Sequence, residues 1–201
     1  MNAASDARFW DRAARKYAAS PVADKDAYTR TLDSTRTLLK GTDHVVELGC
    51  GTGSTALNLA PSVAAYLATD ISEAMISIAR DRNADAPVSG LEFRAATAEQ
   101  VMPAGNRVDA VLGFNYLHMV RDLPRTLRSI RDMLADNGLL ITKTPCLGDM
   151  NPLLRWVALP LMQAFGKAPH AGSFTETQLR DGIRAAGFEI LSVENHGSRG
   201  N

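Results

Sequence analysis

Short apolar runs separated by longer amphipathic segments make up most of the chain. The runs have the length and composition of buried strands and cover residues 44–48, 65–71, 91–97, 108–115 and 138–145. Segments with apolar residues at helical spacing precede or separate them, at residues 5–20, 24–41, 53–60, 73–82 and 123–136. Strands that alternate with helices indicate βαβ units and a mainly parallel sheet with helices on both faces. The pattern therefore predicts an α/β fold with a doubly wound sheet.

The alternation changes after the fifth run. Residues 146–172 are apolar, are interrupted by prolines and are too long for an ordinary connection. We interpret this segment as a lid over a binding site, or alternatively as a dimer contact or added core. Its apolar side chains are Leu153, Leu154, Trp156, Val157, Leu161, Met162 and Phe165.

A helix and a strand are expected to finish the chain. Residues 175–187 carry a capping-box pair, Thr175 and Gln178, and end at a glycine, which predicts a helix. Residues 188–196 predict a sixth strand. We expect one domain over residues 1–201, since that length suits a single core. Its parts are 1–41 as an N-terminal helical cover, 42–145 as the binding core, 146–172 as the lid or insert, and 173–201 as the last helix and strand.

Charge and cysteine content narrow the classes of function. Lys and Arg together number 22, as do Asp and Glu, which argues against a broad nucleic-acid or anionic-membrane footprint. Cys50 and Cys146 are too few for a disulfide framework or a zinc site, so we expect no metal. The first residues lack a secretory signal, and no apolar run reaches the length of a membrane span. We therefore expect a cytoplasmic protein.

The stretch VVELGCGTG, residues 45–53, is the most informative motif. Gly49, Gly51 and Gly53 allow unusual backbone angles and close approach of a ligand in the turn after the first predicted core strand. In an open parallel sheet, ligands bind beyond the carboxyl ends of the strands. Asp70 ends the second strand, 21 residues after Gly49, where a carboxylate can accept both hydroxyls of a ribose. The ligand is therefore expected to contain a nucleoside.

The acid next to the turn argues against a dinucleotide. Glu47 would weaken pyrophosphate binding at the following helix, and it suits a ligand that carries an ammonium group. Ser54 stands where the dinucleotide fingerprint needs its third glycine, and no P-loop lysine follows. A nicotinamide-dependent oxidoreductase nevertheless remains an alternative.

These residues resemble the class I S-adenosylmethionine-dependent methyltransferases, most strongly between residues 44 and 145. The resemblance implies a Rossmann-like fold and S-adenosylmethionine as cofactor. It implies that the ATDIS turn at 68–72 holds the ribose, with Ile71 against the adenine. Thr97 and Ala98 would lie beside the base, although many members carry Asp where this chain has Thr97.

The resemblance also places residues at the methionine and acceptor end of the site. Asn115 would lie at the methionine end, and Tyr17 of the N-terminal helix would cover it. Cys50, inside the glycine turn, is counted with the cofactor-binding residues, although packing also explains a small side chain there. His118 is our candidate base because its pKa range suits proton transfer near pH 7. The alternative is that it packs under the lid or caps the next helix. Tyr116 is either an acceptor-pocket residue or part of the core.

The sequence thus predicts methyl transfer to a small, lipophilic or aromatic acceptor by direct in-line displacement. Nucleic acid is not expected, because NYLH, residues 115–118, replaces the motif of amino-methylating DNA enzymes. A non-catalytic module that binds the cofactor is the second alternative. The family usually ends with a strand pair, and its seventh strand is either missing from this sequence or replaced by a partner at the edge of the fifth strand. An unpaired fifth strand would invite association, so a homodimer is one way to cover it.

Overall fold

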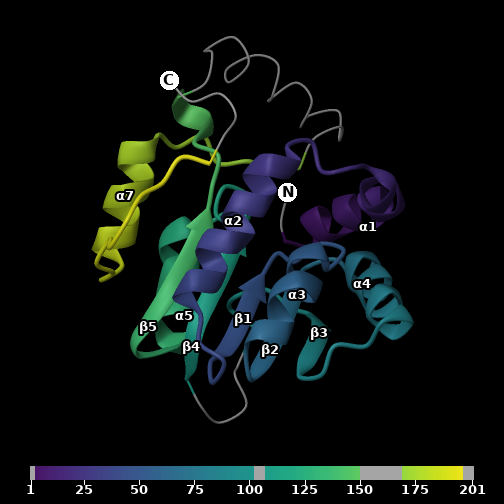
Figure 1. Cartoon of the computed structure of the whole chain (residues 1–201). Coiled ribbons are helices and arrows are strands. Elements are labelled where there is room, and N and C mark those ends of the chain that lie inside the picture. The colour runs from purple at the N-terminus through teal and green to yellow at the C-terminus, as the bar shows by residue number, and fades with distance from the viewer. Residues whose placement is uncertain (1–2, 102–106, 150–168, 197–201) are drawn as a thin grey trace.

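A five-stranded parallel sheet forms the centre of the molecule (Figure 1). The structure is a computed structural model, and it describes residues 3–101, 107–149 and 169–196. The strands lie side by side in the order β3-β2-β1-β4-β5. The strand order therefore switches at β1: β2 and β3 are added on one side of it, and β4 and β5 on the other. Their bounds are β1 His44–Leu48, β2 Ala65–Asp70, β3 Leu91–Ala95, β4 Val108–Phe114 and β5 Leu134–Lys143. The predicted doubly wound α/β fold is confirmed.

Helices cover both faces of the sheet, as Figure 1 shows. Alternate strand residues enter two separate cores, with Val45 in one and Val46 in the other. The first core packs against α2, α3 and α4, and the second against α5 and α7. The helices are α1 Ala3–Ala19, α2 Lys25–Leu38, α3 Ser54–Leu59, α4 Glu73–Asp85, α5 Leu123–Met133 and α7 Glu176–Ala185, with short 3-10 turns at Ala60–Ser62 and Leu147–Asp149.

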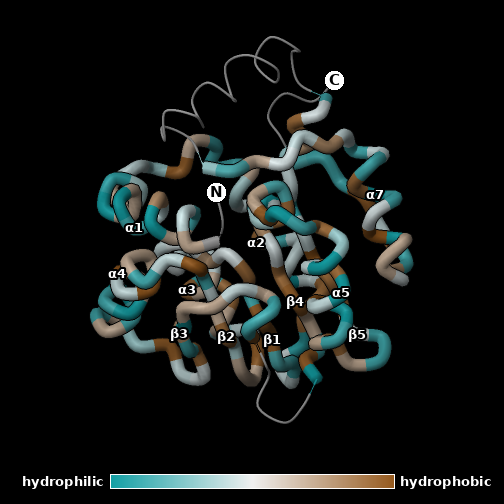
Figure 2. The backbone as a smooth tube through the Cα atoms, turned by 180° about the vertical axis from the view of Figure 1, so that it is seen from behind, coloured by the Kyte–Doolittle hydropathy of each residue, from teal (hydrophilic) through white to brown (hydrophobic). Residues whose placement is uncertain are grey.

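Polar side chains fix where several helices begin. Asp24 accepts a hydrogen bond from the backbone of Ala27 at the start of α2, and Ser72 caps α4 in the same way. The predicted capping box of α7 is present, with reciprocal bonds between Thr175 and Gln178. Figure 2 shows the complementary pattern, with hydrophobic stretches along the strands and hydrophilic stretches on the outer helices.

Helix α5 ends earlier than predicted. The predicted helix reached residue 136, but the structure ends it at Met133 and begins β5 at Leu134. Leu134 already pairs with Val108 of β4, and a bulge then shifts the register until Leu139 pairs with Ala110. Asn137, a residue type that often follows the end of a helix, has φ +65° within this bulge. Asparagine tolerates the left-handed region of backbone angles, and here it adopts that conformation at a strand bulge instead of at a helix end.

The prediction of a sixth strand at residues 188–196 is wrong. This segment forms no strand and is tied instead to α2, where Arg30 and Thr31 bond with His196 at 3.0 Å each. Leu191 and Val193 are 74% and 53% exposed. Because Leu191 and Val193 face solvent, this part of the segment gains little burial that would offset the cost of ordering a strand. In the described part of the chain, β5 pairs only with β4.

Helix α1 lies beside α4, near the carboxyl ends of β1 and β2 (Figures 1 and 2). The predicted lid at 146–172 falls largely on residues 150–168, which lie outside the described residues. The apolar side chains that we assigned to it lie there too. Among the described residues, no helix is long and apolar enough to cross a membrane.

Candidate functional site

The glycine turn after β1 adopts the conformation that its sequence predicts. Gly49, Gly51 and Gly53 have φ of +72°, +54° and +82°. A Cβ atom at Gly49 would lie 2.8 Å from Cδ2 of Tyr116, and one at Gly53 would lie 2.9 Å from Cβ of Ala79. These positions therefore require glycine both for the backbone angle and for space. The turn brings backbone N–H groups to the carboxyl edge of the sheet.

Asp70 joins this turn to the one that follows β2. Its two carboxylate oxygens accept hydrogen bonds from the backbone N–H groups of Gly51 and Ser72, each at 2.9 Å. Burial raises the pKa of Asp70, and the two backbone bonds oppose that rise. Each carboxylate oxygen can accept a second bond, so Asp70 keeps acceptor capacity for ligand hydroxyls.

Glu47 is a deeply buried carboxylate, 2% exposed, at the end of β1. The hydroxyl of Tyr66 donates to its Oε2 atom at 2.9 Å. Burial raises the pKa of Glu47 to about 7, and the negative charge of Asp70 adds to the rise. Within the described ranges no Lys, Arg or His forms an ion pair with Glu47. A buried acid of this kind binds a cationic group far more readily than it stays charged alone.

Helix α1 brings Tyr17 to the glycine turn. The Cε1 atom of Tyr17 lies 3.5 Å from the position of a Cβ at Gly51, and Trp10 packs edge-on against the Tyr17 ring. The pKa of Tyr17 is raised by burial and then by Asp70 and Glu47, so its phenol lies near both acids. Tyr17 is still 52% exposed. The structure thus brings Tyr17, Glu47 and Asp70 together around the turn.

Tyr116 spans the space between two predicted ligand loops. Its ring lies against Gly49, and its hydroxyl bonds with the backbone of Ala98. Burial and then the charge of Glu99 raise the pKa of Tyr116. A hydroxyl with a raised pKa and a backbone partner is better suited to positioning than to proton transfer. Asn115, just before it, has φ +54° and an exposed side chain, and its backbone N–H donates to Lys143.

The remaining predicted cofactor contacts lie at the same edge. Thr97 follows β3, and its backbone N–H donates a hydrogen bond to the side-chain oxygen of Gln100. Ala98 is buried, and Ile71, in the turn after Asp70, is half-buried. Cys50 is also buried, and burial raises the pKa of its thiol well above the usual value, which agrees with a packing role.

His118 lies in the loop after β4, towards α5. Its Nδ1 atom is buried and has no hydrogen-bond partner within the described ranges. Its carbonyl accepts a bond from the backbone of Gly172 at 2.6 Å, which places the last residue of the predicted lid beside it. Burial lowers the pKa of His118, so the imidazole is neutral at pH 7. His170, two residues before Gly172, has its pKa lowered by burial and then by the charge of Arg121.

Sequence reasoning missed two contributors to this site. Tyr66 supplies the hydrogen bond to Glu47, and Arg82 donates to Thr52 in the glycine turn. An aromatic residue in a strand is ordinarily core, and an arginine on a helix is ordinarily solvated. The strand register could have found Tyr66, because Glu47 pairs with Ala68, the residue two after Tyr66 on the same face. Nothing in the sequence marks Arg82.

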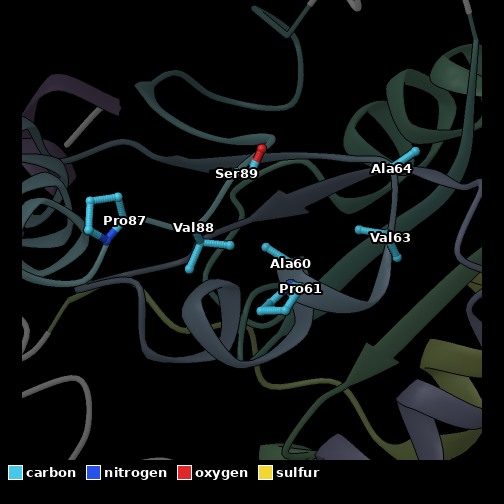
Figure 3. Close-up of a pocket in the computed structure, with 7 residues that line it drawn as sticks. All are labelled: Ala60, Pro61, Val63, Ala64, Pro87, Val88 and Ser89. Atoms are coloured by element: carbon cyan, nitrogen blue, oxygen red, sulfur yellow. The ribbon is translucent and has the colours of Figure 1, made fainter.

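A separate hollow of about 430 Å³ lies at the opposite end of the sheet (Figure 3). It is lined by Ala60, Pro61, Val63, Ala64, Pro87, Val88 and Ser89, all before the amino ends of β2 or β3. None of these side chains titrates, so the hollow offers no group for acid–base chemistry. Among the described residues, no cluster of three or more His, Cys, Asp or Glu could hold a metal ion.

Known proteins include a family and individual sequences that are similar to most of this chain. Residues 10–193 match the family described as "Methyltransferase domain". The chain is similar to ubiquinone biosynthesis O-methyltransferase of Azorhizobium caulinodans, at 28% identity over 77% of this chain and 62% of the relative. It thus spans less than two thirds of that relative's length.

Solved structures show the same likeness. A SAM-dependent methyltransferase of Thermotoga maritima, described as a possible histamine N-methyltransferase, superposes with a TM-score of 0.68 at 26% identity. The superposition covers 92% of this chain and 82% of that one. The DhpI-SAM-HEP complex gives a TM-score of 0.67 at 21% identity, covering 92% and 88%.

Proposed function

The chain belongs to the methyltransferase domain family, and from that premise we propose that it transfers the methyl group of S-adenosylmethionine to a small molecule. One observation carries the proposal more than any other. Buried Glu47, without a cationic partner among the described residues, lies beside a glycine turn whose N–H group also holds Asp70. The two acids match an ammonium and a ribose in one ligand.

In this proposal the ligand's ammonium bonds with Glu47 and its ribose hydroxyls bond with Asp70. Gly49, Gly51 and Gly53 let the backbone approach the ligand closely, with Cys50 packed inside the turn. Ile71, Thr97 and Ala98 border the adenine. Asn115 and Tyr17 lie at the methionine end, and Tyr116 holds the adenine loop against the glycine turn.

The sulfonium of S-adenosylmethionine is a strong electrophile, so the protein needs to align the acceptor, the methyl group and the sulfur. The acceptor's lone pair forms the new bond to the methyl carbon. The carbon–sulfur bond breaks with its electrons left on sulfur, which yields S-adenosylhomocysteine. Alignment of this kind can contribute several kcal/mol, up to roughly 7–11 in well-oriented systems.

We propose that His118 takes up the proton that the acceptor loses. Its lowered pKa keeps the imidazole neutral near pH 7, and its Nδ1 atom has no partner in the described part of the chain. A hydroxyl acceptor that reached this buried nitrogen would supply its missing hydrogen bond before losing its proton. His118 lies after β4, next to the methionine end at Asn115, which suits a group acting on the acceptor.

The acceptor that we propose is lipophilic or aromatic, with an oxygen as the methylated atom. The apolar composition of residues 146–172 supports the first part. The name of the Azorhizobium relative, an O-methyltransferase of ubiquinone biosynthesis, supports the second. The proposed location is the cytoplasm, which cell fractionation tests. The proposed oligomer is a homodimer through the edge of β5, which sedimentation tests.

Calorimetry followed by turnover tests the proposed function. We expect saturable binding of S-adenosylhomocysteine and no binding of NAD, because Ser54 and Glu47 disfavour a pyrophosphate at the turn. Labelled methyl transfer to a panel of hydroxylated aromatic acceptors then separates an enzyme from a binding module. Binding of S-adenosylhomocysteine without turnover on any acceptor would favour the module, and NAD binding alone would favour an oxidoreductase.

A further inference from the structure

Arg82, near the end of α4, contacts two segments that lie far from it in the sequence. Its Nη1 atom donates to the carbonyl of Thr52 at 3.1 Å, to the hydroxyl of Thr52 at 2.8 Å and to the hydroxyl of Ser54 at 3.3 Å. Its Nη2 atom donates to the carbonyl of Ala18 at 3.1 Å. Ala18 follows Tyr17 directly, so one side chain links the end of α1 to the glycine turn.

Helix α1 is also tied to two more of the loops at this edge of the sheet. Asp11 accepts a bond from the hydroxyl of Ser72 at 2.6 Å and from the backbone of Ala74 at 3.2 Å, just after the ribose turn. Asp6 forms a two-bond ion pair with Arg121, at 2.6 and 2.7 Å, in the loop after β4. The helix therefore has polar contacts with the segments that follow β1, β2 and β4.

Apolar burial accounts for only part of the position of α1. Of its described side chains, only Ala14 is fully buried, while Phe9 and Trp10 are partly buried. Elements with few buried apolar contacts open locally at low free-energy cost. We therefore expect polar contacts such as those of Arg82 to contribute to how much of the time α1 lies over the turn.

We propose that Arg82 is a positioning residue that couples closure of α1 to the shape of the glycine turn. This inference rests on the proposed function, because closure places Tyr17 over the bound cofactor. A ligand that binds only the closed arrangement has its apparent affinity reduced by the fraction of molecules that are open. Loss of Arg82 raises that fraction, and it also leaves the carbonyl and hydroxyl of Thr52 without their charged donor.

The test compares Arg82→Gln with Arg80→Gln, a matched control on the same helix. Arg80 also donates two bonds to a backbone carbonyl, at 3.2 and 2.7 Å, but that carbonyl belongs to Phe93 in β3. In the ligand-free protein we expect Arg82→Gln to speed hydrogen exchange across α1, while Arg80→Gln leaves it unchanged. We expect Arg82→Gln to weaken S-adenosylhomocysteine binding on the order of tenfold, as is typical of coupled elements.

Two further variants separate positioning from general destabilisation. Thr52→Val removes one acceptor of Arg82 at similar volume, so we expect smaller changes in the same direction, and this variant replaces Arg82→Gln if the latter does not fold. In a Tyr17→Ala background, Arg82→Gln should lose much of its effect on affinity, because the two residues act through one helix.

Equal exchange and affinity in Arg82→Gln and the wild type would overturn the inference. So would equal losses in the Arg80 and Arg82 variants, or fully additive losses with Tyr17→Ala. Failure of the wild type to bind S-adenosylhomocysteine would instead remove the proposed function. The exchange measurement in the ligand-free protein would still decide whether Arg82 holds α1.

Discussion

Replacing Glu47 with Gln should stabilise the ligand-free protein while removing cofactor binding. Glutamine has nearly the same shape and can still accept the bond from Tyr66, but it carries no charge. Burial raises the pKa of Glu47 from 4.5 to about 7. At pH 8 the folded protein therefore contains an ionised carboxylate whose charge is less stable there than in the unfolded chain. At about 1.4 kcal/mol for each pKa unit, this costs about 3 kcal/mol of unfolding free energy.

The sign of the pH dependence follows from the raised pKa. Between pH 4.5 and about 7 the folded protein keeps a proton that the unfolded chain has lost. The free energy of unfolding of the wild type therefore falls as the pH rises through this interval. The Gln variant lacks this dependence, so its advantage should be near zero at pH 4.5 and reach about 3 kcal/mol at pH 8.

Urea denaturation at several pH values measures this difference. For a chain of this length, about 3 kcal/mol corresponds to a rise in Tm of roughly 6–12 °C. Glu92→Gln is a suitable control, because the Glu92 side chain is 62% exposed and pairs only with Arg94 among the described residues. We expect that control to stay within about 0.5 kcal/mol of the wild type. A Glu47→Gln variant that is less stable than the wild type at pH 8 would refute the reasoning.

The remaining predictions concern the turn, the ribose acid, the base and pH. Gly53→Ala should destabilise the fold by about 1–3 kcal/mol in urea titrations, because it combines φ +82° with a 2.9 Å approach to Ala79, whereas Gly41→Ala meets nothing within 4 Å and should have little effect. Asp70→Asn should weaken S-adenosylhomocysteine by more than about tenfold in calorimetry, the loss expected for one hydrogen bond to a charged group, and an unchanged affinity would remove Asp70 from the site. His118→Ala should lower kcat for a hydroxyl acceptor by about 100-fold or more at pH 7, with cofactor affinity retained, and full turnover would exclude the base role. Affinity for S-adenosylhomocysteine in the wild type should fall below pH 7, as Glu47 takes up a proton, and a pH-independent affinity would contradict this.

Local patterns predicted the part of the site that depends on one stretch of chain. The glycine turn and Asp70 follow strands that are visible as apolar runs, and parallel strands bring their carboxyl ends to one edge. Contacts that depend on register or distant packing were not predictable. The Tyr66–Glu47 bond needs the pairing of β1 with β2, and Arg82 lies 30 residues from Thr52.

The errors in the fold have the same origin. Residues 188–196 have the composition of a strand, but a strand also needs a neighbour that accepts its hydrogen bonds, and sequence alone does not show whether β5 does so. At the end of α5, Asn137 and Gly138 fit a helix stop and a strand bulge equally well. The pairing of Leu134 with Val108 decides between them in favour of the bulge.

Proton release on cofactor binding tests most directly whether Glu47 receives the ligand's ammonium. Titration of the wild type with S-adenosylhomocysteine at pH 7, in two buffers of different ionisation heat, counts the protons exchanged. Since Glu47 has a pKa of about 7 and must be ionised in the complex, we expect one ligand to bind to the wild type and about half a proton to be released. The Glu47→Gln variant should show neither binding nor proton release. Tight binding to the wild type without proton release, or equal affinity in the variant, would contradict the role of Glu47.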